Sequence, residues 1–307
     1  MPREVGWEWK TTGWFVEPQN ARELMSTRGS IGVFSGGQKF ACRGMSSADY
    51  TLESSLQRQL RPRAEEKEVR QKEREYIRAA RDWGLGIQPT GHVDDLQVLS
   101  NLQHHGVPTR LLDFTSNPMT ALWFACQKPA SSAVAQSGVL MALNVTKWQT
   151  YSTVAGPTEL ASWDSLGDPL GHRLTNALSM GAPFVLSSAS PNERLRAQEG
   201  FFVAGRIPEF ESHQVSPTMT FEYLTPFMAF DVSYKHGDSE ELAAKLRSDR
   251  GRGAPGALPF VAVIVRASLK SKLLRYLSDT YNRSARTLSL TTRESWNTDR
   301  RGRRRLS

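Results

Sequence analysis

Cysteine is nearly absent from the chain, which has only Cys42 and Cys126 among 307 residues. Two thiols cannot supply the four ligands of a structural zinc site, and they can close at most one disulfide bridge. No apolar run approaches the roughly 18 residues of a membrane span, and the first thirty residues carry charged side chains where a signal peptide has an apolar core. We therefore expect a cytoplasmic protein with no membrane partner.

The signatures of several common enzyme classes are also missing. There is no Gly-x-x-x-x-Gly-Lys-Ser/Thr phosphate loop, no Gly-x-Gly-x-x-Gly turn that follows a strand, and no Gly-x-Ser-x-Gly elbow. The six histidines form no His-Glu-x-x-His pattern, although His104 and His105 near Asp113 could begin a metal site. These absences argue against nucleotide-hydrolysing P-loop proteins, dinucleotide-binding dehydrogenases, serine esterases and zinc proteases.

The net charge of +8 is concentrated at one end of the chain. Five arginines lie in the last eight residues, so 8 − 5 = +3 is left for everything before them. Such a tail attracts any polyanion by releasing counterions, yet a charge run at a terminus is most simply a solvated end. It favours nucleic acid over other partners only slightly.

Alternating helix and strand signals run through most of the chain. The charged segment Glu65–Asp82 has a narrow apolar stripe and predicts a solvated helix, and because its charges sum to zero we do not expect it to bind nucleic acid. Residues 146–190 are rich in Gly, Ser, Pro and Thr and predict an irregular insertion. The other expected elements are helices over 19–27, 94–105, 117–128 and 269–277, and strands over 39–44, 138–145, 201–203 and 260–266.

The densest group of polar residues lies between Leu102 and Cys126. A helix that Gly106 and Pro108 terminate leads into a loop, and the loop leads into an apolar helix that Asn117 can cap. Polar side chains crowd this loop, and burying them is costly unless they bond one another or a ligand. They are Gln103, His104, His105, Thr109, Arg110, Asp113, Thr115 and Asn117.

This stretch, together with an upstream Arg-Gly pair, resembles the FRG domain, which is named for its Phe-Arg-Gly element. The residues concerned are Arg43-Gly44 at the end of a strand, the segment LESSLQR at 52–58, and the block QHHGVPTRLLDFTSNPMTALWFA at 103–125. Residues 137–145 and the segment NERLRAQEGFF at 192–202 continue the resemblance. It implies an N-terminal extension over 1–24, an FRG domain over 25–281 with the insertion near 146–190, and a basic tail over 282–307.

A remoter similarity, to ADP-ribosyltransferases of the arginine–serine–glutamate type, implies a function. These enzymes have an Arg-Gly-like element on the first core strand, a Ser/Thr-rich strand that enters a helix, and a Glu-containing strand. The corresponding residues here are Arg43-Gly44, Thr115-Ser116 and Gln198-Glu199. The similarity implies an α+β fold with a split β-sheet core, flanking helices and a variable C-terminal portion. It also implies a bacterial toxin or defence effector, with an antitoxin as a further partner.

The resemblance also implies the roles of the site residues in using NAD. Arg43 would hold the dinucleotide phosphates by a forked contact, Thr115 or Ser116 would bind the nicotinamide ribose, and Glu199 would stabilise the positive charge that develops there. Apart from the resemblance, Arg110 and Asp113 flank Leu111 and Leu112, which favours an internal clamp that shapes the loop over a direct catalytic role. Catalytic candidates are Glu199, Thr115 and His104, and NAD-binding candidates are Arg43, Gly44, Gln103, Thr109, Arg110, Asp113, Ser116, Asn117 and Gln198.

The register at Glu199 leaves alternatives open. If Gln198 occupies the first position of a Gln-x-Glu strand, Gly200 falls where the catalytic Glu belongs, and a shift of one residue turns a strand side chain to the other face. A bulge could restore Glu199, or Gln198 and Arg194 could form a different site. The domain could also be a noncatalytic nucleotide or nucleic-acid binding module, or a metal-dependent nuclease that uses His104 and Asp113.

Overall fold

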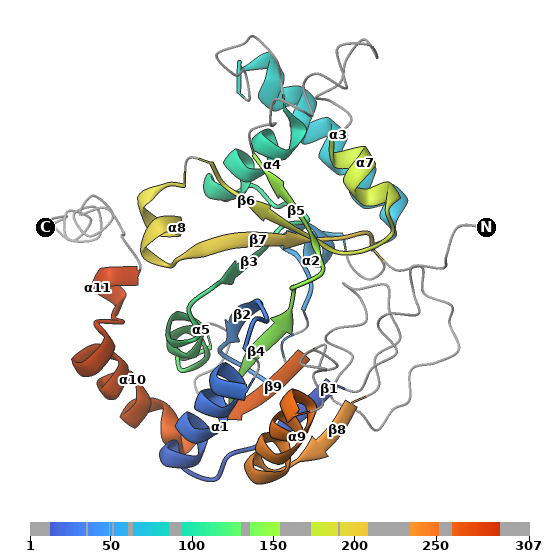
Figure 1. The fold of residues 1–307 in the computed structure, drawn as a ribbon. Helices are drawn as coiled ribbons and strands as arrows, with labels where there is room; N and C mark the ends of the chain where they lie inside the picture. Colours follow the sequence, from blue (N-terminus) through green and yellow to red (C-terminus); the bar gives the residue numbers. More distant parts are fainter. Residues whose placement is uncertain are drawn as a thin grey trace, which may run out of the picture.

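The computed structural model describes residues 13–34, 36–48, 50, 52–60, 64–85, 94–129, 136–153, 173–189, 191–207, 234–251 and 260–288. Within these residues, nine strands form one mixed sheet in the order β5-β6-β7-β3-β2-β4-β9-β1-β8 (Figure 1). The expected combination of sheet and flanking helices is thus present as a mixed α/β fold.

The strands are short, and most pair antiparallel; only β1 with β8 and β9, and β5 with β6, run parallel. Their bounds are β1 Gly13–Val16, β2 Phe40–Met45, β3 Leu112–Thr115, β4 Gly138–Asn144, β5 Gln149–Ser152, β6 Phe184–Ser187, β7 Gly200–Ala204, β8 Tyr234–Gly237 and β9 Phe260–Val265.

The helices lie between these strands along the chain and confirm most of the sequence-based predictions. Their bounds are α1 Ala21–Phe34, α2 Ser55–Gln59, α3 Glu66–Asp82, α4 Asp95–His104, α5 Pro118–Ala125, α7 Arg173–Ser179, α8 Glu193–Ala197, α9 Ser239–Gly251, α10 Ala267–Tyr281 and α11 Ala285–Leu288. None of the helices in the described ranges is both long and apolar enough to cross a membrane.

The ends of α4 and α5 follow from local side-chain chemistry. Asp94 caps α4 by accepting a hydrogen bond from the amide of Leu96, and Gly106 follows the last turn with φ +80°, a conformation that glycine adopts without steric cost. Asn117 caps α5 through its side-chain oxygen, with Pro118 in the first turn. These caps fix both ends of the loop that carries most of the candidate site.

The sheet is weakest at its centre. Strand β2 pairs with β4 through six residue pairs and β3 pairs with β7 through four, whereas β2 and β3 share only the pair Cys42–Thr115. The two halves of the sheet therefore diverge beyond this pair, between the strand that carries Arg43 and the strand that carries Asp113.

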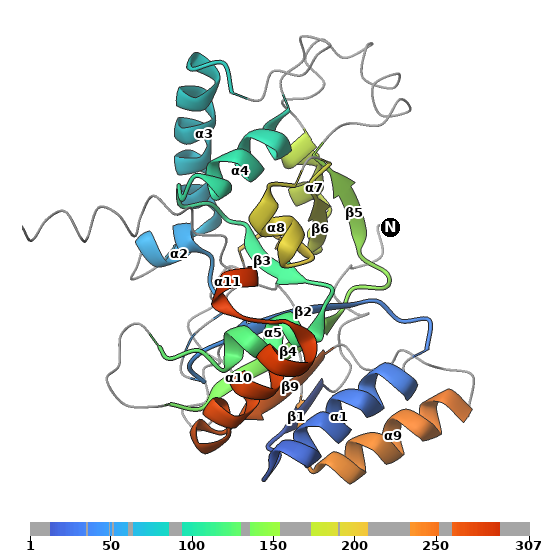
Figure 2. The same ribbon diagram turned by 90° about the vertical axis from the view of Figure 1, so that its left-hand side faces the viewer.

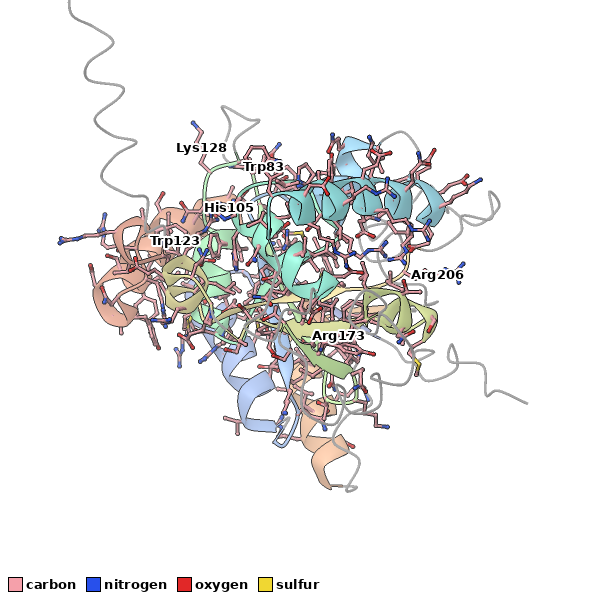
Figure 3. The ribbon with its side chains drawn as sticks, turned by 90° about the horizontal axis from the view of Figure 1, so that it is seen from above. Trp83, His105, Trp123, Lys128, Arg173 and Arg206 are labelled. Carbon is pink, nitrogen blue, oxygen red and sulfur yellow. The ribbon has the colours of Figure 1, made fainter. Side chains whose placement is uncertain are left out.

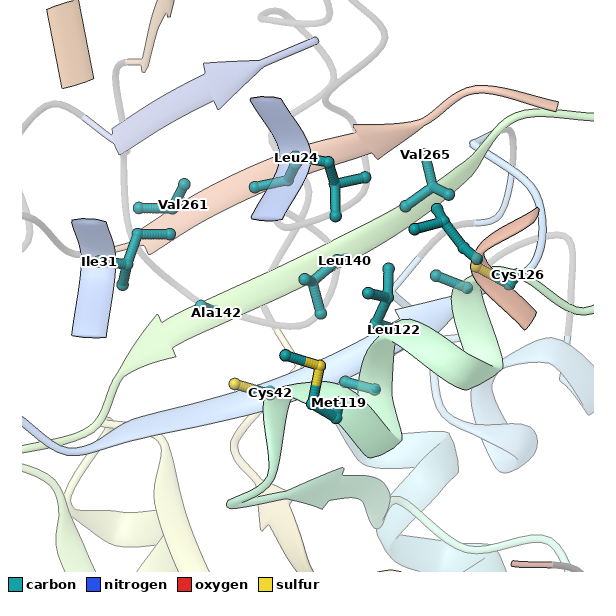
Figure 4. Close-up of a cluster of buried hydrophobic side chains, with 14 of the residues drawn as sticks. Leu24, Ile31, Cys42, Met119, Leu122, Cys126, Leu140, Ala142, Val261 and Val265 are labelled. Carbon is teal, nitrogen blue, oxygen red and sulfur yellow. The ribbon is translucent and has the colours of Figure 1, made fainter. Parts of the chain in front are cut away.

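The largest hydrophobic cluster lies between the sheet and helices α1, α5, α9 and α10. Leu140 and Ala142 of β4 pack there with Val261 of β9, Leu122 of α5 and Leu24 of α1 (Figure 4). Gly44 allows α5 to pack closely on β2, because a Cβ at this position would lie 1.8 Å from the carbonyl oxygen of Ala121. Gly44 thus serves helix packing.

A second cluster joins the other half of the sheet to α3, α4 and α7. Phe184 of β6 and Phe202 of β7 pack there against Leu99 of α4 and Leu174 of α7. Figure 2 shows α4 and α8 above β3 and α5, α10 and α11 below it, so β3 lies where the two groups of helices meet.

The prediction for residues 146–190 was wrong over the part of this segment that the structure describes. Strands β5 and β6 extend the sheet by two strands, and α7 packs on α4. The helix expected over 19–27 also continues to Phe34. The segment 238–258, which we did not assign, contains α9, whose Leu242 is fully buried against the main cluster.

Candidate functional site

The three elements of the proposed motif lie on neighbouring strands. Arg43 is on β2, Thr115 ends β3, and Glu199 immediately precedes β7, whose first residue Gly200 pairs with Thr115. The sheet order places β3 between the other two strands. Segments that are far apart in the sequence thus meet where the two halves of the sheet separate.

Arg43 reaches across the gap between β2 and β3. Its Nη1 donates a hydrogen bond to the carbonyl oxygen of Asp113 at 2.6 Å, and its guanidinium carbon lies 5.8 Å from the ring centroid of Phe114. Its Nε is buried and has no partner among the residues that the structure describes. Burial lowers the pKa of Arg43, the negative charge of Asp113 opposes this, and Arg58 adds to the lowering.

The polar loop residues form a chain of hydrogen bonds that ends at the exposed side chain of Asp113. Thr109 donates from Oγ1 to Oε1 of Gln103 at 2.6 Å, and Nε2 of Gln103 lies 3.4 Å from Oδ2 of Asp113. Thr109 is fully buried and also binds the start of α2 through Ser55. Thr109 and Gln103 therefore orient Asp113, while Thr109 has no free surface for a ligand.

His104 belongs to the same neighbourhood. Its ring lies 5.5 Å from that of Phe202, and its Nε2 is buried without a hydrogen-bond partner in the described part of the chain. Burial lowers the pKa of His104, the charge of Asp113 opposes this, and His105 and Arg194 add to the lowering. A neutral imidazole with one unused nitrogen therefore lies close to Asp113.

Glu199 lies in a turn and not in the strand itself. Its φ of +50° places it in the left-handed region, which non-glycine residues seldom adopt. Its carboxylate Oε1 accepts hydrogen bonds from Nδ2 of Asn117 at 2.8 Å and from Nη2 of Arg283 at 2.7 Å, and its side chain is 45% exposed. The turn directs the carboxylate towards Asn117 at the start of α5.

The two hydroxyls beside Glu199 differ in their availability. Thr115 is buried; its Oγ1 donates to the carbonyl oxygen of Gln198 at 2.6 Å and accepts from the amide of Asn117. Ser116 is exposed, and its Oγ lies at 3.4 Å from the carbonyl oxygen of Glu199. Ser116 is therefore the hydroxyl that can reach a bound molecule, while Thr115 fixes the turn.

Gln198 links the site to α11. It is buried, and its Nε2 donates to the carbonyl oxygen of Leu288 at 2.8 Å. This hydrogen bond ties the end of α8 to α11.

The structure places Arg110 away from the other site residues. It is 1% exposed and binds Glu73 through two short hydrogen bonds of 2.5 and 2.6 Å, with further bonds to Glu66 and to the carbonyl oxygen of Gly205. Burial alone would lower the pKa of Arg110, but Glu73 and Glu66 raise it above its ordinary value. The clamp expected with Asp113 does not form, because Arg110 points to α3.

Arg283 is a residue that the sequence analysis missed. It follows Asn282, which ends α10 with φ +52°, and this turn brings its guanidinium to Glu199. The polar Asn-Arg pair after a leucine-rich helix marks the end of the helix, but nothing near it in the sequence indicates a partner 84 residues away.

The described residues contain no group of three or more His, Cys, Asp or Glu side chains that could hold a metal ion. The polar side chains described above consist instead of two arginines, two carboxylates, an imidazole, a hydroxyl and two amides. They are Arg43, Arg283, Asp113, Glu199, His104, Ser116, Gln103 and Asn117. Such a set suits a ligand with both anionic and hydroxyl groups.

The fold and this cluster define a mixed α/β protein with a polar site where its sheet divides. Residues 38–133 match the family model of the FRG domain, so this part of the chain is similar to that family. The match includes Arg43, the loop and α5, and it ends before Glu199. Comparisons with curated proteins and with solved structures found no match.

Proposed function

We propose that this protein is an NAD-dependent ADP-ribosyltransferase-like enzyme that modifies a nucleic acid or a protein. The observation that carries the proposal is the adjacency of the three motif elements on β2, β3 and β7. The pairing of β2 and β3 adds support. These strands share a single residue pair, so the sheet is nearly divided at the site, and the resemblance implies a split-sheet core.

Arg43 has unused capacity for an anion. Its buried Nε has no partner in the described structure, and its hydrogen bond to Asp113 is made by Nη1. A guanidinium that stays charged can donate two parallel hydrogen bonds to a phosphate. We assign the diphosphate of NAD to Arg43.

We assign Glu199 to the nicotinamide ribose. Asn117 and the left-handed turn orient its carboxylate next to the exposed Ser116. Breaking the bond between C1′ and the nicotinamide nitrogen leaves positive charge on the ribose, and a nearby carboxylate stabilises that charge. Ser116, in preference to the occupied Thr115, would donate to or accept from a ribose hydroxyl.

The reaction balances without a further reactant. The electron pair of the broken C1′–N bond leaves with nicotinamide, whose ring nitrogen becomes neutral. An oxygen or nitrogen of the acceptor then forms a bond to C1′ and loses its proton to solvent or to a neighbouring base. The protein binds the dinucleotide, orients the ribose and stabilises charge.

A noncatalytic nucleotide-binding module is the second candidate, and one contact favours it. Arg283 forms a salt bridge with Glu199 at 2.7 Å, which offsets the negative charge that the transition state would use. In this case Arg43 would still hold the phosphates, while Glu199 would only anchor α10.

Transfer of a label from the adenylate side of NAD tests the proposal. The full chain is incubated with the labelled NAD and, separately, RNA, DNA or cell lysate, beside Arg43→Ala and Glu199→Gln. Label on one acceptor class that is lost in both variants supports the transferase. Binding of NAD without transfer, lost only in Arg43→Ala, supports the binding module and contradicts the transferase.

A further inference from the structure

A groove that shares no lining residue with the candidate site has a row of arginines along one wall. It lies between α3, the start of α4 and α7, and its cavity volume is about 570 Å³. Ile77 and Leu174, both buried, form part of its lining. Figure 3 shows the side chains of α3 along the rim of the molecule, with Trp83 at the C-terminal end of the helix.

The arginines occupy one stripe of α3. Arg70, Arg74, Arg78 and Arg81 all line the groove at spacings of four, four and three residues. Side chains at these spacings lie on one helix face, and with a rise of 1.5 Å per residue neighbouring arginines are about 5 to 6 Å apart along the axis. The stripe is therefore a track of positive charge about 16 Å long.

The acidic residues of the groove neutralise only the ends of this track, because Asp95 pairs with Arg81 and Glu73 lies 3.9 Å from Arg70. Glu73 binds Arg110 beneath the groove, and Asp95 binds Arg81. The remaining acid, Asp82, lies at the end of α3. The net charge of segment 65–82 is zero, but Glu66 and Glu73 bind the buried Arg110. The net charge of the sequence therefore does not describe the charge of the face that lines the groove.

The two central arginines are free to bind a ligand. Arg74 and Arg78 are exposed and make no hydrogen bond or salt bridge with any residue in the described ranges. Arg70 donates to Oγ1 of Thr175 on the opposite wall at 2.7 Å, so the groove is closed at that end. Burial lowers the pKa of Arg70 despite Glu73, and the charges of Arg110 and Arg74 lower it further, which shows how closely the cations are held.

We propose that this groove binds the phosphodiester backbone of a single-stranded nucleic acid, with Arg74 and Arg78 each contacting a phosphate. A linear track fits evenly spaced phosphates better than one anion, for which the arginines would converge. The groove lies outside the candidate NAD site, so binding does not depend on the proposed enzymatic activity.

Fluorescence anisotropy without NAD tests this proposal. The probes are a labelled oligouridylate and oligothymidylate of about 15 nucleotides. All proteins are full-length and carry Arg→Gln changes at 300, 301, 303, 304 and 305, so that the basic tail does not mask the groove. Arg74→Ala/Arg78→Ala is compared with Lys272→Ala/Arg275→Ala, which removes the same charge from exposed positions on α10.

We expect the groove variant to bind about tenfold more weakly. The slope of log K against log salt should become shallower by about 1.4, which is about 0.7 for each of the two lost phosphate contacts on a single strand. Arg74→Lys/Arg78→Lys should retain most of the affinity, and thermal melting should be unchanged. Equal affinities of the groove and α10 variants would overturn the proposal. So would displacement of the probe by polyglutamate as effectively as by unlabelled oligonucleotide, which would indicate an acidic protein partner.

Discussion

Replacing Arg110 with Met should destabilise the protein by about 3 to 5 kcal/mol. The substitution roughly preserves volume but leaves Glu73, 1% exposed, without the two short hydrogen bonds that neutralise it. Breaking a buried pair by removing one partner costs about this much, because a buried charge is left uncompensated. Arg70, at 3.9 Å from Glu73, compensates only in part. The loss is a large share of a typical total stability of about 5 to 15 kcal/mol.

Urea unfolding of the purified full chain measures this loss. With a slope of about 3 kcal/mol/M, the midpoint should fall by about 1 to 2 M. Arg74→Met on the same helix is the matched control; it is exposed and makes no described contact, so its effect should stay within about 0.5 kcal/mol. Arg110→Met/Glu73→Gln should be more stable than Arg110→Met alone, because the double variant has no unpaired Glu73 charge.

The single and double variants together decide whether the reasoning holds. A loss below about 1 kcal/mol, or a double variant no more stable than the single one, would refute the account of this ion pair.

Three further predictions follow from packing and burial. Gly44→Ala should cost more than about 3 kcal/mol in urea unfolding, because its Cβ would meet the backbone of α5, whereas Gly29→Ala, with nothing within 4 Å, should gain up to about 1 kcal/mol; equal effects would contradict the close packing. Burial raises the pKa of Cys42 and Cys126 to about 12, so neither thiol should react with a disulfide reagent near neutral pH until the protein unfolds. Burial lowers the pKa of His104, so the free energy of unfolding should decrease as the pH falls through about 6, and His104→Gln should reduce this dependence.

Local chemistry made several elements predictable. The cap at Asp94, the glycine at position 106 and the Asn117-Pro118 pair act within one helical turn, so their effect can be read from neighbouring residues. The strand before α10 was also predictable, because β9 is buried along its whole length and its sequence is a continuous apolar run.

Short edge elements were not predictable in the same way. Strands β5 and β6 have four residues each, too few to establish an alternating pattern, and their place in the sheet depends on β7, which follows them in sequence. Composition alone therefore indicated a loop.

The candidate site was predicted where its residues are close in sequence and missed where they are distant. The order of Gln103, Asp113 and Asn117 indicated a polar loop, and hydrogen bonds link its members. Arg110 was paired with the nearest acid, Asp113, although its partner Glu73 lies 37 residues earlier on the inner face of α3. No pattern in the sequence links Arg283 to Glu199.

The central claim is that Glu199 acts on NAD bound through Arg43, and nicotinamide release tests it most directly. The rate is measured with the wild-type chain and with Glu199→Gln over a range of NAD concentrations, so that kcat and KM are separated. The account predicts that the variant keeps a KM within a few-fold of wild type and loses about 100-fold or more in kcat, as expected when a group that stabilises transition-state charge is removed. Release by the variant at the wild-type rate, or no release by the wild type with its acceptor present, would contradict it.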